Sequence, residues 1–136
     1  MSRLVIVDTA AIVGYLSETD PWHAAADAFF EKLPKPFLTC EAAITESCFL
    51  MQRSANGESQ LLKLITTGIL RVEFSLSDEA EKVGSLMRKY KSVPMSLADA
   101  CLVRMSEIFD ASVFTFDGDF SIYRRHGRQK IPLIGF

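Results

Sequence analysis

The residues best placed to do chemistry are four acids in unusually apolar surroundings. Asp8 and Asp117 each follow a largely apolar segment, and Asp99 is flanked by two alanines. Glu46 is the only charged residue in the segment 42–51. Burying a carboxylate costs several kcal/mol unless it is paired with a cation or bound to a metal, so acids are rare in such settings. Four of them in one chain suggest a shared role.

Each acid also has a structural interpretation when it is taken alone. Asp8 is a favoured residue type at a helix N-cap. Ser96 followed by Asp99 matches a capping box, in which the two residues satisfy the backbone at the start of a helix. Asp117-Gly118 is a common turn dipeptide. The sequence leaves these alternatives open for the single residues, and only their convergence would separate the two interpretations.

Glu46 has a different alternative, an ion pair with Arg53 or Arg104 across helices. No lysine or arginine, however, is embedded among apolar residues beside these acids. Three or four converging carboxylates would therefore require a cation, and oxygen ligands favour Mg²⁺ or Mn²⁺ over Zn²⁺. Such an ion polarises phosphate, activates water and stabilises a leaving oxygen. The pattern therefore predicts phosphoryl chemistry.

The acids can meet only if the chain forms a parallel sheet. The run Leu4–Val7 has no polar alternation, which is typical of a strand buried on both faces. Residues that follow adjacent parallel strands emerge at the same edge, where open α/β sheets bind ligands. We therefore expect Asp8 and Asp117 at one edge, with Asp99 in the first turn of a helix that begins nearby.

Helix and strand patterns alternate along the chain, which predicts an α/β fold. We expect a central parallel sheet of four or five strands with helices on both faces, in a single domain of residues 1–136. The predicted strands cover residues 4–7, 37–39, 69–74, 111–116 and, at an edge because of Pro132, 131–134. The predicted helices cover 9–17, 20–33, 42–53, 59–67, 77–90 and 96–109. The helix at 20–33 is expected to begin with Asp20 as N-cap, the helix at 42–53 to be mostly buried, and the helix at 77–90 to be capped by Ser77.

Composition limits the class of protein. A hydrophobic fraction of 49% with 24% charged residues is typical of a soluble globular domain. No apolar run approaches the ~18 residues of a membrane span, and the N-terminus lacks a signal-peptide pattern. The three cysteines form no Cys-x-x-Cys pair, which favours reduced thiols. We therefore expect a cytoplasmic protein with no membrane association.

The net charge of −2 hides an uneven distribution. All 17 acidic residues lie at or before Asp119, and 4 of the 15 basic residues follow it. The C-terminal segment is thus a basic patch on an acidic body. It would either contact a polyanion or serve only as a solvated, solubilising tail.

Four pieces of the chain, taken together and in order, resemble the PIN domain family. They are Val-Asp-Thr at residues 7–9, Glu46, Ser-Leu-Ala-Asp-Ala at 96–100 and Thr-Phe-Asp-Gly-Asp-Phe at 115–120. The length and order are most similar to VapC-type toxins of bacterial and archaeal toxin–antitoxin pairs. The resemblance covers the whole chain and implies a metal-dependent endoribonuclease, a hydrolase that cuts RNA with water as the nucleophile.

The resemblance also implies roles for individual residues. The family's acidic quartet, which is catalytic, is matched by Asp8, Glu46, Asp99 and Asp117. Of these, Asp8, Asp99 and Asp117 would bind Mg²⁺ or Mn²⁺, and Glu46 would complete the ligand shell or position the water. Asp119 matches an auxiliary acid of the last motif. The hydroxyl positions that usually orient such carboxylates are matched by Thr9, Ser96 and Thr115.

The basic segment gains a role from this implied activity. Arg124, Arg125 and Arg128 would hold RNA phosphates as charge contacts, which position a substrate without specifying its sequence. We expect these three side chains to be exposed. Which RNA is cut, and whether one metal ion or two take part, stay open.

Several other functions fit parts of the pattern. A phosphatase of the haloacid dehalogenase kind also places an acid after its first strand, but it needs a second acid where this chain has Ala10, and it also needs a lysine near the site. A stand-alone PIN-fold nuclease of RNA processing would have the same site. A non-catalytic PIN-like module would keep the acids only for stability.

The third and fourth predicted helices carry more apolar surface than a small domain can readily cover. We expect part of it to be covered by a second copy in a homodimer, by a helix of a small antitoxin protein, or by both. The alternative is that all of these residues lie in the core. The six residues concerned are Phe49, Leu50, Leu61, Leu62, Leu64 and Ile65.

Overall fold

Strand β1, Val5–Val7, lies at the centre of a five-stranded sheet in the computed structural model, which describes residues 4–135. The strand order is β3-β2-β1-β4-β7, and every neighbouring pair is parallel. β1 is buried along its whole length, as expected of a strand without polar alternation. The predicted parallel sheet with helices on both faces is confirmed. The expected domain bounds also include residues 1–3 and 136, which lie outside the described part.

The elements follow the predicted alternation. The other strands of the sheet are β2 (Phe37–Thr39), β3 (Leu70–Val72), β4 (Ser112–Phe114) and β7 (Leu133–Ile134). The helices are α1 (Thr9–Leu16), α2 (His23–Lys32), α3 (Glu41–Leu50), α4 (Gly57–Thr66), α5 (Leu76–Lys89) and α6 (Leu97–Phe109). A 3₁₀ turn, η1 (Gly118–Ser121), and an antiparallel hairpin of β5 (Arg124–Arg125) and β6 (Gln129–Lys130) were not predicted.

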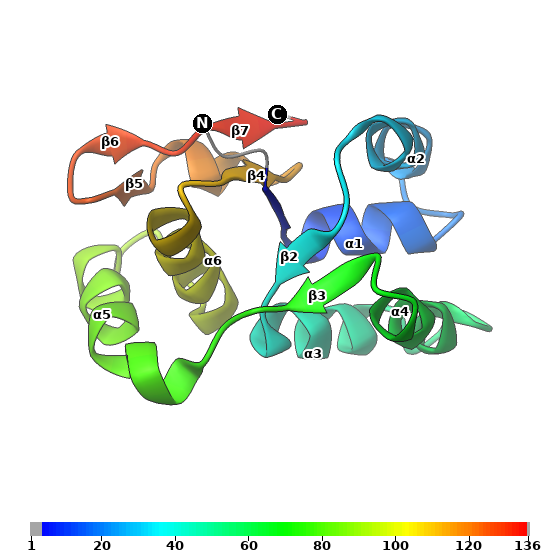
Figure 1. The fold of residues 1–136 in the computed structure, drawn as a ribbon, viewed down its shortest axis with the longest axis horizontal. Coiled ribbons are helices and arrows are strands. Elements are labelled where there is room, and N and C mark those ends of the chain that lie inside the picture. The colour runs from blue at the N-terminus through cyan, green and yellow to red at the C-terminus, as the bar shows by residue number, and fades with distance from the viewer. Residues whose placement is uncertain (1–3, 136) are drawn as a thin grey trace.

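The sheet separates two hydrophobic cores, because successive side chains of a strand point to opposite faces. Val5 and Val7 belong to the core that includes residues of α1, α2 and α4, whereas Ile6 belongs to the core formed with α5 and α6. Figure 1 shows these two groups of helices on opposite sides of the strands. Helix α3 contributes to both cores through Ala43 and Ile44. The sheet is therefore held between packed layers that fix its strand ends.

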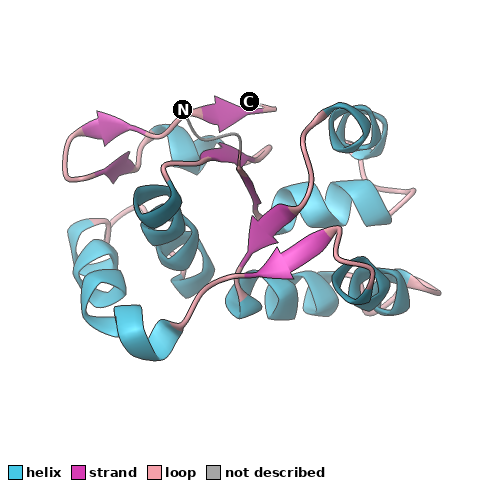
Figure 2. Ribbon diagram, in the orientation of Figure 1, coloured by secondary structure: helices cyan, strands magenta, loops and turns pink. Residues whose placement is uncertain are grey.

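Two C-terminal segments extend the fold beyond β4. Strand β7 pairs with β4 at the edge of the sheet, as predicted for the segment with Pro132. The β5–β6 hairpin forms a separate two-stranded ribbon outside this sheet (Figure 2), and β5 contacts α6. The hairpin escaped prediction because each strand has two residues and its turn passes through positive φ at His126 (51°) and Gly127 (82°).

Helix α3 is less buried than predicted. Phe49 and Leu50 at its C-terminal end are 66% and 57% exposed. Two helix starts also differ from the prediction. Helix α5 is capped by Ser75 rather than Ser77, and α2 begins at His23 because the Asp20 carboxylate closes a turn instead of capping the helix. None of the described helices combines the length and apolar character that a membrane crossing requires.

Candidate active site

The carboxylate of Asp8 lies at the carboxyl end of β1 and is almost completely buried, with 3% exposure. One oxygen, Oδ1, accepts a hydrogen bond of 2.9 Å from the Ala11 N–H, so Asp8 is the N-cap of α1. The other oxygen, Oδ2, accepts a hydrogen bond from the Thr115 hydroxyl at the end of β4. The capping interpretation is therefore correct, but it accounts for only one of the two oxygens.

The environment of Asp8 opposes its ionisation. Burial is the largest influence and raises the pKa of Asp8 to about 7, against the hydrogen bonds from Thr115 and Ala11, which lower it. The negative charges of Asp117 and Asp99 raise this pKa further. Three acids predicted for the site are thus close enough to repel one another.

Asp99 lies in the first turn of α6 and is half-buried. The helix N-cap is Ser96, whose Oγ accepts a hydrogen bond of 3.0 Å from the Asp99 N–H. The Asp99 carboxylate instead accepts a hydrogen bond of 2.8 Å at Oδ2 from the Tyr123 hydroxyl. Burial raises the pKa of Asp99, the Tyr123 hydrogen bond lowers it, and the charges of Asp117 and Glu46 raise it. The quartet is linked electrostatically through Asp99.

The turn after β4 organises the last two acids. Asp117 Oδ1 accepts a hydrogen bond of 2.9 Å from the Asp119 N–H, which starts the 3₁₀ turn. The Asp117 N–H donates to Thr115 Oγ1 over 2.8 Å. Because the same Thr115 hydroxyl donates to Asp8, it joins the ends of β1 and β4. Asp119 is half-buried beside this turn.

Glu46 lies on α3 and is half-buried. The alternative in which it pairs with Arg104 is wrong, because Arg104 binds Glu79 (2.6 Å) and Glu107 (3.2 Å). None of the ion pairs between described residues includes Glu46 or Arg53. Its charge therefore acts on the site without a neutralising partner from α6.

The hydroxyl groups of Thr115 and Thr9 differ in their contacts. Thr115 touches Asp8 directly, as the resemblance implied. Thr9 is placed differently, because its hydroxyl donates to the Ala43 carbonyl over 3.4 Å and so ties α1 to the helix that carries Glu46. Its contact orients an element rather than a carboxylate.

The candidate metal ligands are of the chemical type that binds a hard divalent ion. All of the candidate ligands are carboxylate oxygens, and none of the ion pairs between described residues involves them. In the described part of the chain, however, no three acid, histidine or cysteine side chains already converge as a metal-binding group. Ligation by Asp8, Asp99 and Asp117 therefore stays a prediction, which the repulsion raising the pKa values of Asp8 and Asp99 supports.

The basic segment is more firmly built into the fold than predicted. The Arg125 side chain is only 11% exposed, binds Asp110 over 2.8 Å and donates to the Ser106 carbonyl over 3.0 Å. Arg124 donates through Nη1 to three neighbouring carbonyl oxygens and is half-buried. The expectation that both are exposed is wrong, because they anchor the hairpin. Arg128 is exposed as expected.

Sequence reasoning missed Tyr123. This residue is completely buried, and its ring packs edge-on against Tyr90 and Phe120 at centroid distances of 5.1 and 5.3 Å. Its hydroxyl reaches Asp99 from a segment that was predicted to be an exposed tail. The available signal was a tyrosine three residues after Phe120, which suggests a buried aromatic pair on one short turn.

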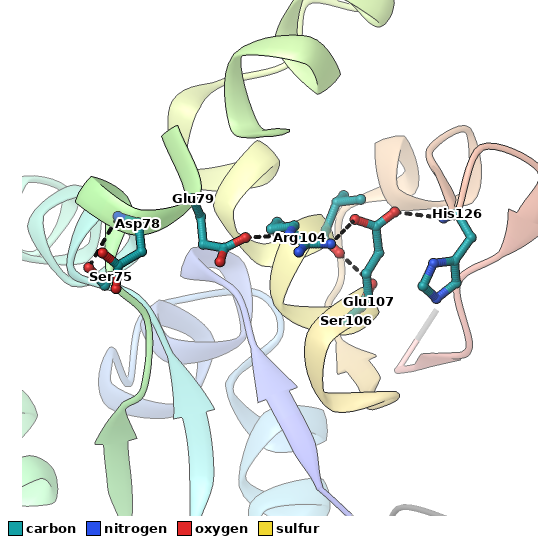
Figure 3. A network of polar contacts seen from close by, with 8 residues as sticks. Ser75, Asp78, Glu79, Arg104, Ser106, Glu107 and His126 are labelled. Atoms are coloured by element: carbon teal, nitrogen blue, oxygen red, sulfur yellow. Dashed lines mark hydrogen bonds and ion pairs between the residues drawn. The ribbon is translucent and has the colours of Figure 1, made fainter. Parts of the chain in front are cut away.

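A surface hollow of about 640 Å³ lies away from the carboxylates. It lies among α5, α6 and the hairpin turn, where Glu79, Arg104 and Glu107 form an ion-pair network (Figure 3). Glu107 also accepts a hydrogen bond of 2.6 Å from the His126 N–H. These charges pair with one another, so the network joins two helices and the hairpin.

Comparisons with known proteins agree with this architecture. The crystal structure of VapC20 from Mycobacterium tuberculosis, described as a toxin that cleaves the sarcin–ricin loop, superposes with a TM-score of 0.79. The two chains are 21% identical, and the match covers 87% of this chain and 93% of that one. No curated protein sequence matches significantly. The family model described as PIN domain matches residues 5–125, a span that includes β1, the four acids and the start of the hairpin, and the chain therefore belongs to the PIN domain family.

Proposed function

We propose that this protein is an endoribonuclease that hydrolyses RNA phosphodiester bonds with Mg²⁺ or Mn²⁺ as cofactor. The observation that carries the proposal is Asp8, a carboxylate with 3% exposure and no cationic partner among residues 4–135, whose pKa is raised to about 7 by burial and by the charges of Asp117 and Asp99. A protein keeps such an arrangement at a functional site more often than elsewhere. Membership of the PIN domain family supports the same activity.

The residues of the chain divide the chemical work. Asp8, Asp99 and Asp117 would hold the metal ion. When bound, the ion would polarise the phosphate and lower the pKa of a water molecule. Thr115 fixes the Asp8 carboxylate, and the Asp117 N–H fixes Thr115, so β1 and β4 position their two acids together. Glu46 would orient the attacking water from α3.

The proposed substrate is a structured RNA cut at an exposed loop. VapC20, which this chain resembles in fold, is described as cleaving the sarcin–ricin loop, and this supports the same class of substrate for the present chain. Arg128 would contact a phosphate from the hairpin, because its side chain is exposed. Arg124 and Arg125 would keep the hairpin in place.

Cleavage of an RNA stem-loop tests the proposed chemistry. The purified protein should cut with Mg²⁺ or Mn²⁺ and stop in excess EDTA. Asp8→Asn should reduce the rate at least ~10²-fold, because a ligand that places the activated water is lost. Asp27→Asn is a matched control, because Asp27 is exposed on α2, and its rate should match wild type. Full wild-type activity in excess EDTA would overturn the metal mechanism.

A role as the toxin of a toxin–antitoxin pair is the second part of the proposal. Phe49, Leu50 and Leu62 on α3 and α4 are each more than half exposed, which would suit a second copy or a small antitoxin protein. A stand-alone RNA-processing nuclease would share the chemistry and lack the small partner. Expression together with the adjacent open reading frame separates the two, because an antitoxin would co-purify and suppress cleavage.

A further inference from the structure

A buried tyrosine reaches the proposed site from outside the acidic motifs. Tyr123 follows η1 and donates its hydroxyl to Asp99 Oδ2 over 2.8 Å. Burial is the largest influence that raises the pKa of Tyr123, followed by the hydrogen bond to Asp99 and the charges of Asp99, Asp119 and Asp117. The hydrogen-bond geometry makes the phenol a donor to the Asp99 carboxylate.

The tyrosine ring is held from several sides. It contacts Tyr90 at 5.1 Å with an interplanar angle of 65°, and Phe120 at 5.3 Å with an angle of 82°. The Tyr90 hydroxyl accepts a hydrogen bond of 2.9 Å from the Arg124 N–H, the residue directly after Tyr123. Lys89, at the end of α5, donates to the Gly127 carbonyl over 2.9 Å and so fixes the hairpin turn on this helix. The position of the phenol is therefore set by α5 and the hairpin together.

The helix that carries Asp99 offers its carboxylate other contacts. A partner outside that helix is therefore needed to fix the orientation of the carboxylate. A carboxylate three residues after an N-cap serine can turn back to the N–H of the cap. In this structure the Asp99 carboxylate is engaged by the Tyr123 hydroxyl and by a side-chain hydrogen bond with Ser96, whose Oγ also caps α6. Hydrogen bonds that orient metal ligands commonly change metal affinity by about 10- to 100-fold when they are removed.

We propose that Tyr123 is a positioning residue of the site, whose phenol holds the Asp99 carboxylate in the orientation that accepts a divalent cation. This inference rests on the proposed metal-dependent function. Its consequence is that loss of one hydroxyl, with the ring retained, weakens Mn²⁺ binding. The cleavage rate should fall at limiting Mn²⁺ and recover at saturating Mn²⁺, while KM for RNA stays unchanged.

The effect of the Tyr123 hydroxyl on Mn²⁺ affinity can be measured directly with Tyr123→Phe. Binding is followed by the loss of the electron paramagnetic resonance signal of free Mn²⁺. We expect an affinity about tenfold weaker than wild type. Tyr15→Phe is the matched control, because it also removes one phenol hydroxyl and keeps the ring, but Tyr15 stacks on Phe30 in the core on the other face of the sheet. Its affinity should remain within about twofold of wild type. Equal Mn²⁺ affinity of Tyr123→Phe and wild type would overturn the role of Tyr123 and leave the proposed nuclease intact.

A second measurement follows the metal response of the wild-type site by nuclear magnetic resonance. The chain has three tyrosines, so protein labelled with ¹³C at tyrosine Cζ gives three resonances, which the two phenylalanine variants assign. Saturating Mg²⁺ should shift the Tyr123 resonance and leave that of Tyr15 in place. A Tyr123 resonance that does not move while Mg²⁺ binds would also overturn the inference. Failure of wild-type protein to bind either ion would instead overturn the proposed metal site itself.

Discussion

Asp8 serves two opposing purposes at the scale of a single residue. Its Oδ1 caps α1, which stabilises the fold, while its burial beside Asp99 and Asp117 destabilises the ionised form. It is the most buried acid of the quartet, and the Thr115 hydroxyl only partly compensates. A bound cation would favour the deprotonated form, so the cost of the site to stability should depend on pH and on metal.

The raised pKa of Asp8 leads to a prediction about the metal-free protein. The folded-state pKa, about 7, exceeds the ordinary value of 3.8, so the folded state binds this proton more tightly than the unfolded state. The stabilisation is complete below pH ~4 and is lost as pH rises through about 7, by on the order of 4 kcal/mol. Thermal melts in EDTA should show this loss for wild type.

Asp8→Asn should remove most of that pH dependence and be more stable than wild type in EDTA near pH 8. Asparagine is an equally good N-cap, so the hydrogen bond from Ala11 is kept. Mn²⁺ should stabilise wild type at pH 8 and have little effect on the variant. Parallel pH profiles for the two proteins in EDTA would contradict the raised pKa.

At the same scale, the sequence predicted where Asp8 and Asp117 lie in the fold more reliably than how each acid is held. Apolar flanks identified Asp8 and Asp117, because a carboxylate after a buried strand must lie at the sheet edge. The partners could not be predicted, since the Tyr123 contact with Asp99 joins segments 24 residues apart through the path of a turn. Thr9 was assigned to a carboxylate and contacts a carbonyl instead.

At the scale of elements, the strands were predictable and the hairpin was not. A short apolar run without polar alternation has apolar side chains on both faces. Both faces are buried only in the centre of a covered sheet, which is where β1 lies. The β5–β6 ribbon depends on contacts from elsewhere, because Arg125 is anchored by Asp110 and the Ser106 carbonyl at the end of α6. Such anchors need Asp110 in a left-handed conformation (φ 48°), which composition does not reveal.

The anchored Arg125 and the exposed Arg128 of the hairpin should respond differently to substitution, the first in stability and the second in RNA binding. Arg125→Ser should destabilise the protein by about 1–3 kcal/mol, because the Ser106 carbonyl loses a hydrogen bond from a charged donor and Asp110 loses its ion-pair partner. Arg128→Ser should leave the melting temperature unchanged and weaken RNA binding. It should also flatten the salt dependence, because one fewer phosphate contact releases fewer counterions. An Arg128→Ser variant with the wild-type salt slope would place the RNA elsewhere, such as at Arg88, Lys89 and Lys91.

At the scale of the whole molecule, the apolar surface is distributed unevenly. Of the six residues expected to need a partner, Leu61 is buried, Leu64 and Ile65 are half-buried, and Phe49, Leu50 and Leu62 are 54–66% exposed. The alternative that all six lie in the core is wrong. Periodicity could not separate Leu61 from Leu62, because the direction that α4 faces is set by its packing on β3 and α1.

The exposed side chains lie on α3 and α4, two helices that contact each other. Leaving such residues in water is unfavourable by ~25 cal/mol per Å², so a covering partner should stabilise the protein. We expect wild type to sediment as a homodimer at micromolar concentration, or to co-purify with a small antitoxin when the neighbouring frame is expressed. Leu62→Glu should weaken this association, because it places a charge in the apolar contact.

Ile108→Glu is the matched control for this last prediction, because Ile108 is 44% exposed but lies on α6. Both variants replace an exposed apolar side chain on a helix, so a general effect on solubility or stability would appear in both. Association lost only in Leu62→Glu would locate the contact on α4. A wild-type monomer across micromolar concentrations, with no small protein co-purifying, would contradict the proposed covering of α3 and α4 and favour a stand-alone nuclease.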